Sequence, residues 1–177
     1  MPKRKRKIFS RPRKLYDKAR ITEEDEIVKR YGLKSKREIW KADSAISKIR
    51  NLAKSLITKS EEEKNAFVNR LKEKGFNVKT IPDVLALNKE DWLKRRLQSI
   101  VVKKGITKTY GQARQIINHK HIIMEGKIID SPSHLTTLEE EKTVETRLAL
   151  PEKKLISDEE KQILKQIKPK EKEEKTE

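Results

Sequence analysis

The side chains with the clearest chemical use in this sequence lie around a short helix predicted to begin after Thr109. Thr109 and Gln112 have the spacing of a capping box, in which two side chains satisfy backbone N–H groups at a helix start. The helix dipole and the remaining free N–H groups favour a phosphate at such an end. Lysines precede this helix and the planar guanidinium of Arg114 lies within it. These residue types support binding to the phosphates of a nucleic acid.

Basic residues extend this candidate site in both directions along the chain. A second set lies in the N-terminal arm, which contains two prolines and no helical period, so we expect it to be extended when free. Phosphate binding is the preferred interpretation of the arm, and a solvated tail or a nuclear-import patch is the alternative. The predicted RNA-binding residues are Lys3, Arg4, Lys5, Arg6, Lys7, Arg11, Arg13, Lys14, Arg95, Arg96, Lys103, Lys104, Lys108, Thr109, Tyr110, Gln112, Arg114, His119, Lys120, His121 and Lys127.

The histidines raise the question of a metal site. His119 and His121 are two residues apart in a predicted extended step, which would place their rings on opposite faces, and His134 is the only other histidine. The absence of cysteine excludes disulfides and thiolate zinc ligands. No glycine-rich phosphate loop or triad-like spacing occurs. We therefore predict no metal, no cofactor and no catalytic residue, and a protein that is not an enzyme.

The charge distribution supports a polyanionic partner. The 177 residues are 41% charged and 33% hydrophobic, with a net charge of +17. A chain of this length and composition suits one domain or two small ones with a small core. Residues 1–20 carry ten Lys and Arg against one acid, and residues 91–131 carry nine against three. Such a charge destabilises a compact chain by self-repulsion unless an anion compensates it. The longest apolar run is too short for a membrane span, and no signal peptide follows the basic N-terminus.

Capping patterns and apolar spacing predict the elements that position these residues. Capping boxes at Thr22, Ser35 and Ser60 predict three helices, of which the first ends at Gly32 and the third at Gly75. The second helix carries a core-facing stripe with a three-and-four spacing. This stripe consists of Ile39, Ala42, Ile46, Ile49, Ala53 and Leu56, and is widened by Trp40 and Ile57.

The second half of the chain is predicted to mix helices and strands. Residues 76–87 are predicted to be irregular because of Pro82, and Asn88 with Asp91 predicts the start of a helix that continues to Gly105. One face of that helix carries Leu93, Leu97, Ile100 and Val101. Residues 122–129 predict a hairpin that turns at Glu125 and Gly126. Leu135, Leu138, Val144, Leu148 and Leu150 indicate one or two further strands, and the residues after Ser157 predict a short helix.

The predicted fold class is α+β. We expect a mostly helical N-terminal region with a basic extended arm, plus a small helix–helix–hairpin RNA-binding module with a small antiparallel sheet. The predicted domains are residues 1–20 as the arm, 21–90 as the helical region, 91–150 as the RNA-binding α+β module and 151–177 as a charged, largely disordered tail. Aromatic residues for base stacking are few, so recognition is expected to depend on the shape and phosphates of structured RNA.

Several segments together resemble the RNA-binding module of small ribosomal subunit protein 4. They match that module in order and spacing: Arg95-Arg96-Leu97-Gln98, Ala113-Arg114-Gln115-Ile116-Ile117, His119-x-His121-Ile122, Gly126-Lys127 and Ser131-Pro132-Ser133. Upstream, two further segments are similar to the archaeal and eukaryotic branch of the family: Tyr31-Gly32-Leu33-Lys34 and Lys36-Arg37-Glu38-Ile39-Trp40. The resemblance covers residues 3–150.

The chain departs from the family pattern at three places. Lys120 stands between the histidines where the family often has Gly, and Glu125 stands before the turn glycine where it often has Asn. Thr109-Tyr110 replaces the usual Ser-Arg at the helix start. These departures concern individual RNA contacts and leave the expected fold unchanged.

The resemblance implies a structural constituent of the small ribosomal subunit that is located in the cytoplasm on ribosomes. It implies a primary binder of small-subunit rRNA at a junction of the 5′ domain, which nucleates subunit assembly and influences mRNA entry and translational accuracy. The expected partners are small-subunit rRNA, neighbouring small-subunit ribosomal proteins and mRNA where it enters the subunit, with no membrane and no small-molecule substrate. The same module also occurs in RNA-modifying enzymes and synthetases, for whose catalytic domains this chain has no room.

Two alternatives to a ribosomal role remain at this point. One is a standalone basic RNA- or DNA-binding protein, or a nucleic-acid chaperone acting outside the ribosome, which predicts little preference among polyanions. The other is a fragment of an RNA-modifying enzyme, which predicts a catalytic constellation that the sequence does not offer.

Overall fold

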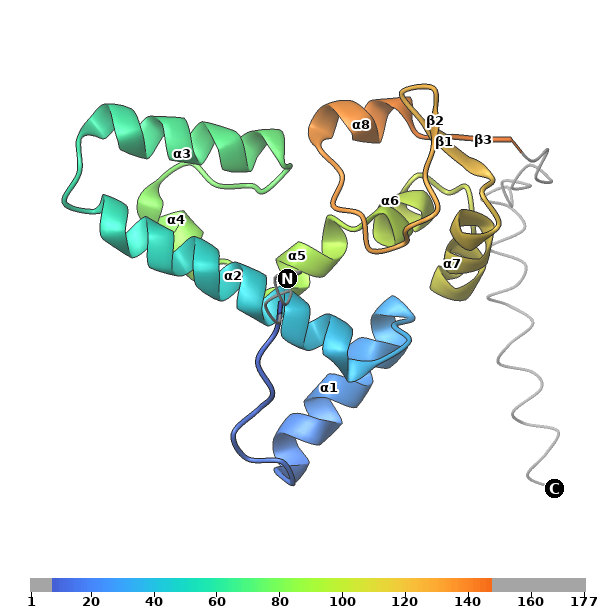
Figure 1. The fold of residues 1–177 in the computed structure, drawn as a ribbon, viewed down its shortest axis with the longest axis horizontal. Coiled ribbons are helices and arrows are strands. Elements are labelled where there is room, and N and C mark those ends of the chain that lie inside the picture. The colour runs from blue at the N-terminus through green and yellow to red at the C-terminus, as the bar shows by residue number, and fades with distance from the viewer. Residues whose placement is uncertain (1–7, 148–177) are drawn as a thin grey trace, which may run out of the picture.

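The computed structural model of this protein describes residues 8–147 (Figure 1). The described helices are α1 (Lys18–Tyr31), α2 (Lys36–Leu56), α3 (Glu61–Glu73), α4 (Ile81–Ala86), α5 (Lys89–Lys94), α6 (Leu97–Lys103), α7 (Tyr110–Asn118) and α8 (Leu138–Thr143). The described strands are β1 (Ile122–Met124), β2 (Lys127–Ile128) and β3 (Glu145–Thr146). This arrangement confirms the predicted α+β class. No helix among the described residues has the length and apolar character needed to cross a membrane.

Helix α1 ends where the sequence predicts but begins earlier. Gly32 follows its last residue with a φ of +55°, a left-handed conformation that glycine adopts without strain. The prediction that Thr22 opens the helix was wrong, because Asp17 is the N-cap and its carboxylate accepts from the Arg20 N–H at 3.5 Å. Thr22 lies inside the helix, where its hydroxyl donates to the Lys18 carbonyl at 3.0 Å. The Thr22 and Asp25 spacing is therefore a chance match to the capping-box pattern inside a helix.

Helix α2 is the longest helix in the described part of the chain and contributes to two hydrophobic cores. Ser35 is its N-cap, and Glu38 accepts from the Lys34 N–H at 3.1 Å. The predicted stripe is confirmed at Ile39, Ala42, Ile46 and Ala53, which are buried, whereas Ile49 and Leu56 are half-buried. The prediction that Ile57 widens the stripe was wrong: it follows the last helical residue and is 52% exposed.

Residues 76–87 contain a helix where the sequence predicted an irregular segment. Helix α4 has a capping box in which Thr80 and Asp83 bond to each other's backbone, and Pro82 lies at its start. Proline is tolerated there because the first N–H groups of a helix need no intrahelical partner. The predicted helix start at Ser60 and the glycine stop at Gly75, with a φ of +76°, are both confirmed.

The predicted continuous helix from Asn88 to Gly105 was wrong, because it breaks at Arg95 and Arg96. Asn88 and Asp91 form the predicted capping box of α5, but Arg96 is extended, with ψ at 145°. Beyond the break, backbone groups pair with residues 131–136: Leu97 N–H donates to the His134 carbonyl at 2.8 Å. Thr136 N–H likewise donates to the Arg95 carbonyl at 3.1 Å. A later segment of chain thus replaces the helical hydrogen bonds that the break removes.

The sheet is small and antiparallel, with strand order β2-β1-β3. The hairpin of β1 and β2 turns at Glu125 and Gly126, as predicted. A third strand, β3, is present, and the buried Val144 directly precedes it. The prediction of a strand at Leu138 was wrong, because Leu138 begins α8 and is 44% exposed. Leu135 forms only an isolated bridge with Arg96. Leu148, Leu150 and the helix predicted after Ser157 lie outside the described residues.

Three hydrophobic clusters hold these elements together. One lies between α1, the first half of α2 and Leu93 of α5, and a second lies between the rest of α2, α3 and α4. The third lies between α6, α7, β1 and Val144. In Figure 1, α5 lies beside the middle of α2, and α6, α7, α8 and the sheet form a unit at the other end of the molecule from α3. We call α6 through β3 the hairpin unit. The predicted domain boundary after residue 90 stays a prediction.

Candidate nucleic-acid interface

The start of α7 is capped by side chains, as the sequence predicts. The Thr109 hydroxyl accepts from the Gln112 N–H at 3.3 Å. The Gln112 side-chain oxygen accepts from the N–H of Lys108 at 3.3 Å, one residue earlier than a regular capping box would require. Ala113 and Ile117 anchor the other face of α7 in the core at 0% exposure. The packing of Ala113 and Ile117 therefore fixes the position of α7, and its capped end and polar face remain exposed to solvent.

Several predicted cations around α7 are exposed and free of acidic partners within the described residues. Lys108 precedes the helix, Lys120 follows it and Lys127 lies in the hairpin. We call these three residues the rim lysines. Lys120 has a φ of +61°, the left-handed conformation that commonly ends a helix and that glycine adopts with the least strain. Exposed lysines without partners are available for phosphates.

Lys103 and Lys104 already have partners in the protein. Lys103 lies 3.3 Å from Glu141, with 71% of its side chain exposed. The Lys104 amine donates to the carbonyls of Lys142 and Val144 at 3.1 and 3.3 Å. An exposed ion pair such as that of Lys103 contributes little to stability, so Lys103 can exchange its partner for a phosphate.

The two neighbouring histidines lie close together rather than on opposite faces. The ring centroids of His119 and His121 are 6.3 Å apart, because the left-handed Lys120 turns the chain between them. The sequence-based expectation of opposite faces was therefore wrong. His134 is elsewhere, 3.3 Å from Glu140. No group of three or more His, Asp or Glu side chains within residues 8–147 could hold a metal ion.

Arg95 is buried and links three segments of the protein. Its guanidinium donates to the carbonyls of Lys74 and Thr136, each at 3.1 Å, and pairs with Glu141 at 2.6 Å. Arg95 is only 7% exposed, and it lies so close to Gly75 that a Cβ there would be 2.3 Å from the guanidinium carbon. Burial by itself raises the pKa of Glu141. The hydrogen bond and charge of Arg95, and then those of Lys103, lower this pKa by more, so that it lies below its usual value.

Arg96 and Arg114 share one carboxylate across the molecule. Arg96, 4% exposed, and Arg114 each form an ion pair with Glu38 of α2, the latter at 3.0 Å. Arg114 also donates to the Gly32 carbonyl at 3.3 Å. Burial alone would raise the pKa of Glu38, yet the hydrogen bonds and charges of the two arginines hold it below its usual value. We call Arg95, Arg96 and Arg114 the junction arginines.

The junction arginines differ in their surroundings from the exposed lysines with which the sequence groups them. Arg95 and Arg96 are predicted RNA-binding residues, but their guanidinium groups face protein carboxylates and carbonyls. Arg114 keeps 21% of its side chain exposed. No local pattern marks Glu38 and Glu141 as partners of these arginines, because the arginines lie 46 to 76 residues away along the chain.

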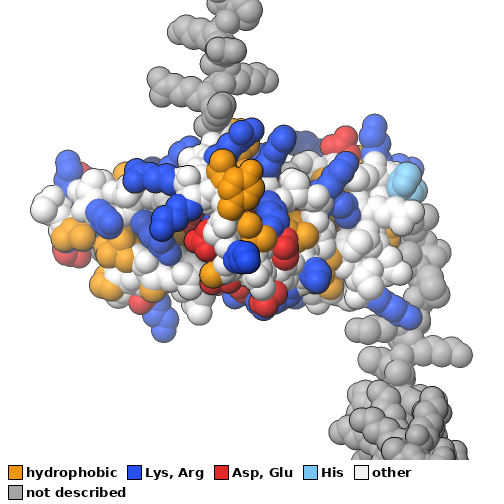
Figure 2. All heavy atoms as spheres, turned by 90° about the horizontal axis from the view of Figure 1, so that it is seen from below, with side chains coloured by type: hydrophobic (Ala, Val, Ile, Leu, Met, Phe, Trp, Pro, Cys, Tyr) orange, Lys and Arg blue, Asp and Glu red, His pale blue; other side chains and the backbone are white. Residues whose placement is uncertain are grey.

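The described part of the N-terminal arm is attached to α1. Arg11, Arg13 and Lys14 are exposed, whereas Lys3 to Lys7 lie outside the described residues. Arg20 donates to the carbonyls of Lys14 and Leu15 at 3.0 Å each. Arg20 is itself held at 2.7 Å by Glu24, a buried carboxylate that also accepts from the Trp40 indole. Figure 2 shows Lys and Arg side chains spread over the face of the molecule seen from below.

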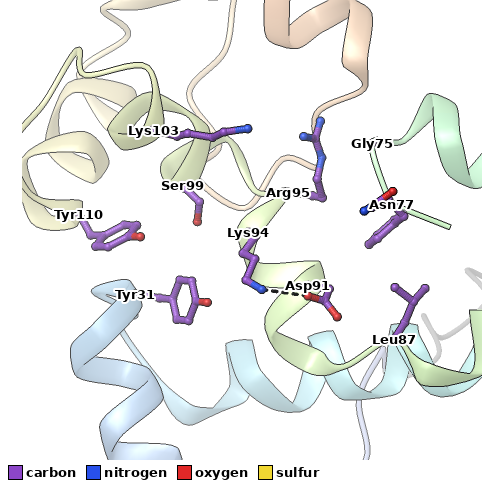
Figure 3. A pocket seen from close by; sticks show the side chains of 11 residues that line it. Tyr31, Gly75, Asn77, Leu87, Asp91, Lys94, Arg95, Ser99, Lys103 and Tyr110 are labelled. Carbon is purple, nitrogen blue, oxygen red and sulfur yellow. Dashed lines mark hydrogen bonds and ion pairs between the residues drawn. The ribbon is translucent and has the colours of Figure 1, made fainter. Parts of the chain in front are cut away.

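A cleft between the helical region and the hairpin unit was not anticipated from the sequence (Figure 3). It has a volume of about 650 Å³. Tyr31 and Tyr110 lie side by side along one part of its wall, with ring centroids 5.8 Å apart. Lys94, Lys103 and Asn77 line it as well. No local pattern in the sequence indicates that positions 31 and 110 meet.

A helical pair, a β-hairpin and exposed lysines around a capped helix define the class of small RNA-binding modules. Consistent with this class, the S4 domain pattern matches residues 95–141. Most of the chain is similar to proteins named small ribosomal subunit protein uS4. The relative from Saccharolobus solfataricus is 40% identical over 151 residues, covering 81% of this chain and 83% of the relative.

Relatives from other archaea give the same result. The protein named small ribosomal subunit protein uS4 from Nanoarchaeum equitans is 40% identical and covers 80% of this chain and 83% of its own length. The protein of the same name from Hyperthermus butylicus is 41% identical, and the match covers 81% of this chain and 85% of the relative. The chain belongs to the uS4 family, and the resemblance found in the sequence is confirmed.

Proposed function

We propose that this protein is a structural constituent of the small ribosomal subunit that binds small-subunit rRNA. The observation that carries the proposal is the set of rim lysines, which lie before α7, after α7 and in the hairpin, and which are exposed with no acidic partner within residues 8–147. Membership of the uS4 family supports the ribosomal setting, because the relatives are named as small-subunit proteins. The role is structural rather than catalytic, and the location is the cytoplasm, on ribosomes.

The proposed RNA-contacting set is narrower than the set of basic residues in the sequence. It consists of the rim lysines, Lys103, the α7 start at Thr109 to Gln112, the exposed edge of Arg114, the His119 and His121 step and the basic arm. Arg95 and Arg96 support this surface from within, since both are buried in ion pairs with the protein's own carboxylates. Lys104 contributes charge while bonded to backbone carbonyls.

The finer part of the proposal concerns the place of binding. We infer a primary contact at a junction of the rRNA 5′ domain, where a rigid protein that joins two sets of helices can hold RNA helices in a fixed arrangement. Such a contact would nucleate assembly, and neighbouring small-subunit proteins would then bind. Influence on mRNA entry and on translational accuracy belongs to the same proposal.

The test compares the full chain bound to a 5′-domain rRNA transcript with the same chain bound to a scrambled RNA of equal length. We expect a preference of about a hundredfold that persists near 0.2 M salt, which corresponds to roughly 3 kcal/mol. Equal affinity for the two RNAs, lost together as salt rises, would identify a generic polyanion binder and overturn the ribosomal assignment.

A further inference from the structure

The cleft of Figure 3 combines three kinds of group that single nucleotides bind. Its volume of about 650 Å³ lies within the range of about 300–1,000 Å³ that is typical of small-ligand sites. Aromatic rings from α1 and α7 form one part of its wall, and cationic side chains from α5 and α6 lie beside them. Bases stack on aromatic rings and phosphates bind lysines. A site that offers both is suited to a nucleotide rather than to a purely apolar ligand.

Two polar groups at this cleft have no partner within the described residues. The side-chain amide of Asn77 is exposed and makes no hydrogen bond there, and neither does the hydroxyl of Tyr110, whose ring is half-buried. The hydroxyl of Tyr31, in contrast, contacts the Glu90 carboxylate at 3.3 Å and Ser99 donates to the Leu93 carbonyl at 2.6 Å. An amide can donate to and accept from the edge of a base at the same time.

The cations at the cleft are held loosely enough to change partners. Lys94 pairs with Asp91 at 3.0 Å, and 60% of its side chain is exposed. Lys103 is 71% exposed at its ion pair with Glu141. Exposed pairs of this kind contribute about 0–1 kcal/mol, so a phosphate can displace the carboxylates. Arg95 is part of the wall only, because its buried guanidinium is bonded to Lys74, Thr136 and Glu141.

We propose that this cleft binds one unpaired nucleotide of the bound RNA, with its base against the half-buried Tyr110, which the buried ring of Tyr31 supports, and its phosphates at Lys94 and Lys103. The Asn77 amide contacts an edge of the base. This inference rests on the proposed function, because it names the part of an RNA that the cleft receives. It adds base recognition to a surface that otherwise holds RNA by shape and phosphates.

The rigid position of Tyr110 supports this assignment. Tyr110 is the first residue of α7, and its Cβ lies against Gly32, where any Cβ added to the glycine would approach it to 2.7 Å. Gln98 donates from its amide to the Tyr110 carbonyl at 3.0 Å and to the Tyr31 and Gly32 carbonyls at 3.2 Å. The two tyrosines are therefore held together by one buried side chain. A preformed aromatic wall loses little conformational entropy when a base binds to it.

The test measures binding of the full chain to short RNA tetramers of each of the four bases. The comparison ligand is an abasic tetramer with the same sugars and phosphates, so that the charge contribution is equal in the two arms. We expect the wild-type chain to prefer at least one base-bearing tetramer over the abasic one by roughly tenfold, in line with the usual contribution of one stacked base. Tyr110→Ala and Asn77→Ala should reduce this preference, while Asn51→Ala, at an exposed asparagine of α2, should keep it.

The outcomes separate this inference from the proposed function. Equal binding of all tetramers by the wild-type chain, no binding of any of them, or a preference that both cleft variants retain would overturn the nucleotide site. A loss of preference in either cleft variant, with Asn51→Ala unaffected, supports it. Thermal unfolding checks that Tyr110→Ala is folded, and Asn77→Ala provides an independent test because its side chain is exposed. The rRNA and scrambled-RNA comparison can fail without changing the tetramer result, and the reverse also holds.

Discussion

The junction arginines and the rim lysines carry the same charge in opposite environments. Arg95 and Arg96 are 7% and 4% exposed and bind carboxylates and carbonyls of the protein, whereas Lys108, Lys120 and Lys127 are exposed and have no acidic partner in the described chain. The planar guanidinium can satisfy several fixed acceptors at once, while the lysine amine suits a mobile contact with phosphate. The number of basic residues in a segment therefore does not tell how many of them reach RNA.

The same comparison explains why the helical region and the hairpin unit stay together. Glu38 belongs to α2, and it is held by Arg96 before α6 and by Arg114 of α7. Glu141 of α8 is held by Arg95. Each buried ion pair links elements that are distant in sequence, so the charge that would otherwise repel within the protein joins its two halves.

Removal of the shared carboxylate should have the largest effect on stability. Glu38→Gln leaves Arg96 buried without a charged partner, and we expect it to lower the free energy of unfolding by about 3 kcal/mol. Urea unfolding of the variant and the wild-type chain measures this loss. The control is Glu62→Gln in α3, which is exposed and should change stability by less than about 0.5 kcal/mol. Equal stabilities of the two variants would show that the junction pairs are dispensable.

Removal of the rim lysines should affect RNA binding and leave stability unchanged. We expect the triple variant of Lys108, Lys120 and Lys127 to Gln to bind the 5′-domain transcript on the order of a hundredfold more weakly near 0.15 M salt. The slope of log affinity against log salt should fall by about three, one for each lost phosphate contact. Filter binding over a salt series measures both quantities.

A matched triple variant tests whether position matters as well as charge. Lys54 at the end of α2, Lys59 in the loop that follows it and Lys72 in α3 are also exposed, and their change to Gln removes the same charge. An affinity loss as large as that of the rim variant would mean that RNA responds to net charge alone, and the rim would lose its assigned role.

Acid should weaken the junction before it affects the rim. The pKa values of Glu38 and Glu141 lie below the ordinary 4.5 in the folded protein, so their contribution to stability is present above about pH 4.5. That contribution is lost as the pH falls through the folded-state pKa values. We expect the free energy of unfolding to decrease as the pH is lowered through this range. The decrease per pH unit should be smaller in Glu38→Gln, which lacks one of the two carboxylates. Denaturant unfolding between pH 6 and pH 3 measures the two slopes, and parallel curves would contradict the prediction.

The smallest effect is expected from the cap of α7. Thr109→Ala removes the hydroxyl that accepts from the Gln112 N–H, and should lower stability by about 1 kcal/mol. Thr22→Ala is the matched control, because Thr22 has the same sequence pattern but lies inside α1. Alanine favours a helix interior, so this control should be neutral or slightly stabilising. Thermal unfolding of the two variants distinguishes a true cap from a chance pattern.

Many elements of the fold could be predicted because their signals are local. The helix starts at Ser60, Asn88 and Thr109 depend on side chains that reach backbone groups three residues away, and the hairpin depends on a two-residue turn at Gly126. The family could be identified for a related reason, since its motifs keep their spacing along the chain. The match to relatives over 81% of the chain confirms that identification.

Other features depend on residues that meet only in the folded protein. The break between α5 and α6 exists because residues 131–136 provide backbone partners for residues 95–98, and no local pattern reveals them. The burial of Arg95 and Arg96 follows from the same break, which turns both side chains toward Glu141 and Glu38. The cleft likewise requires that Tyr31 meets Tyr110.

The sequence by itself therefore determined the class of the fold, several helix boundaries, the excess of positive charge and the family. Tertiary structure alone decided which cations stabilise the protein and which remain available to RNA. The physical reason is that capping and apolar periodicity act within a few residues, whereas the partners of Arg96 and Arg114 are 58 and 76 residues away. Whether a charge is buried or exposed depends on such distant contacts.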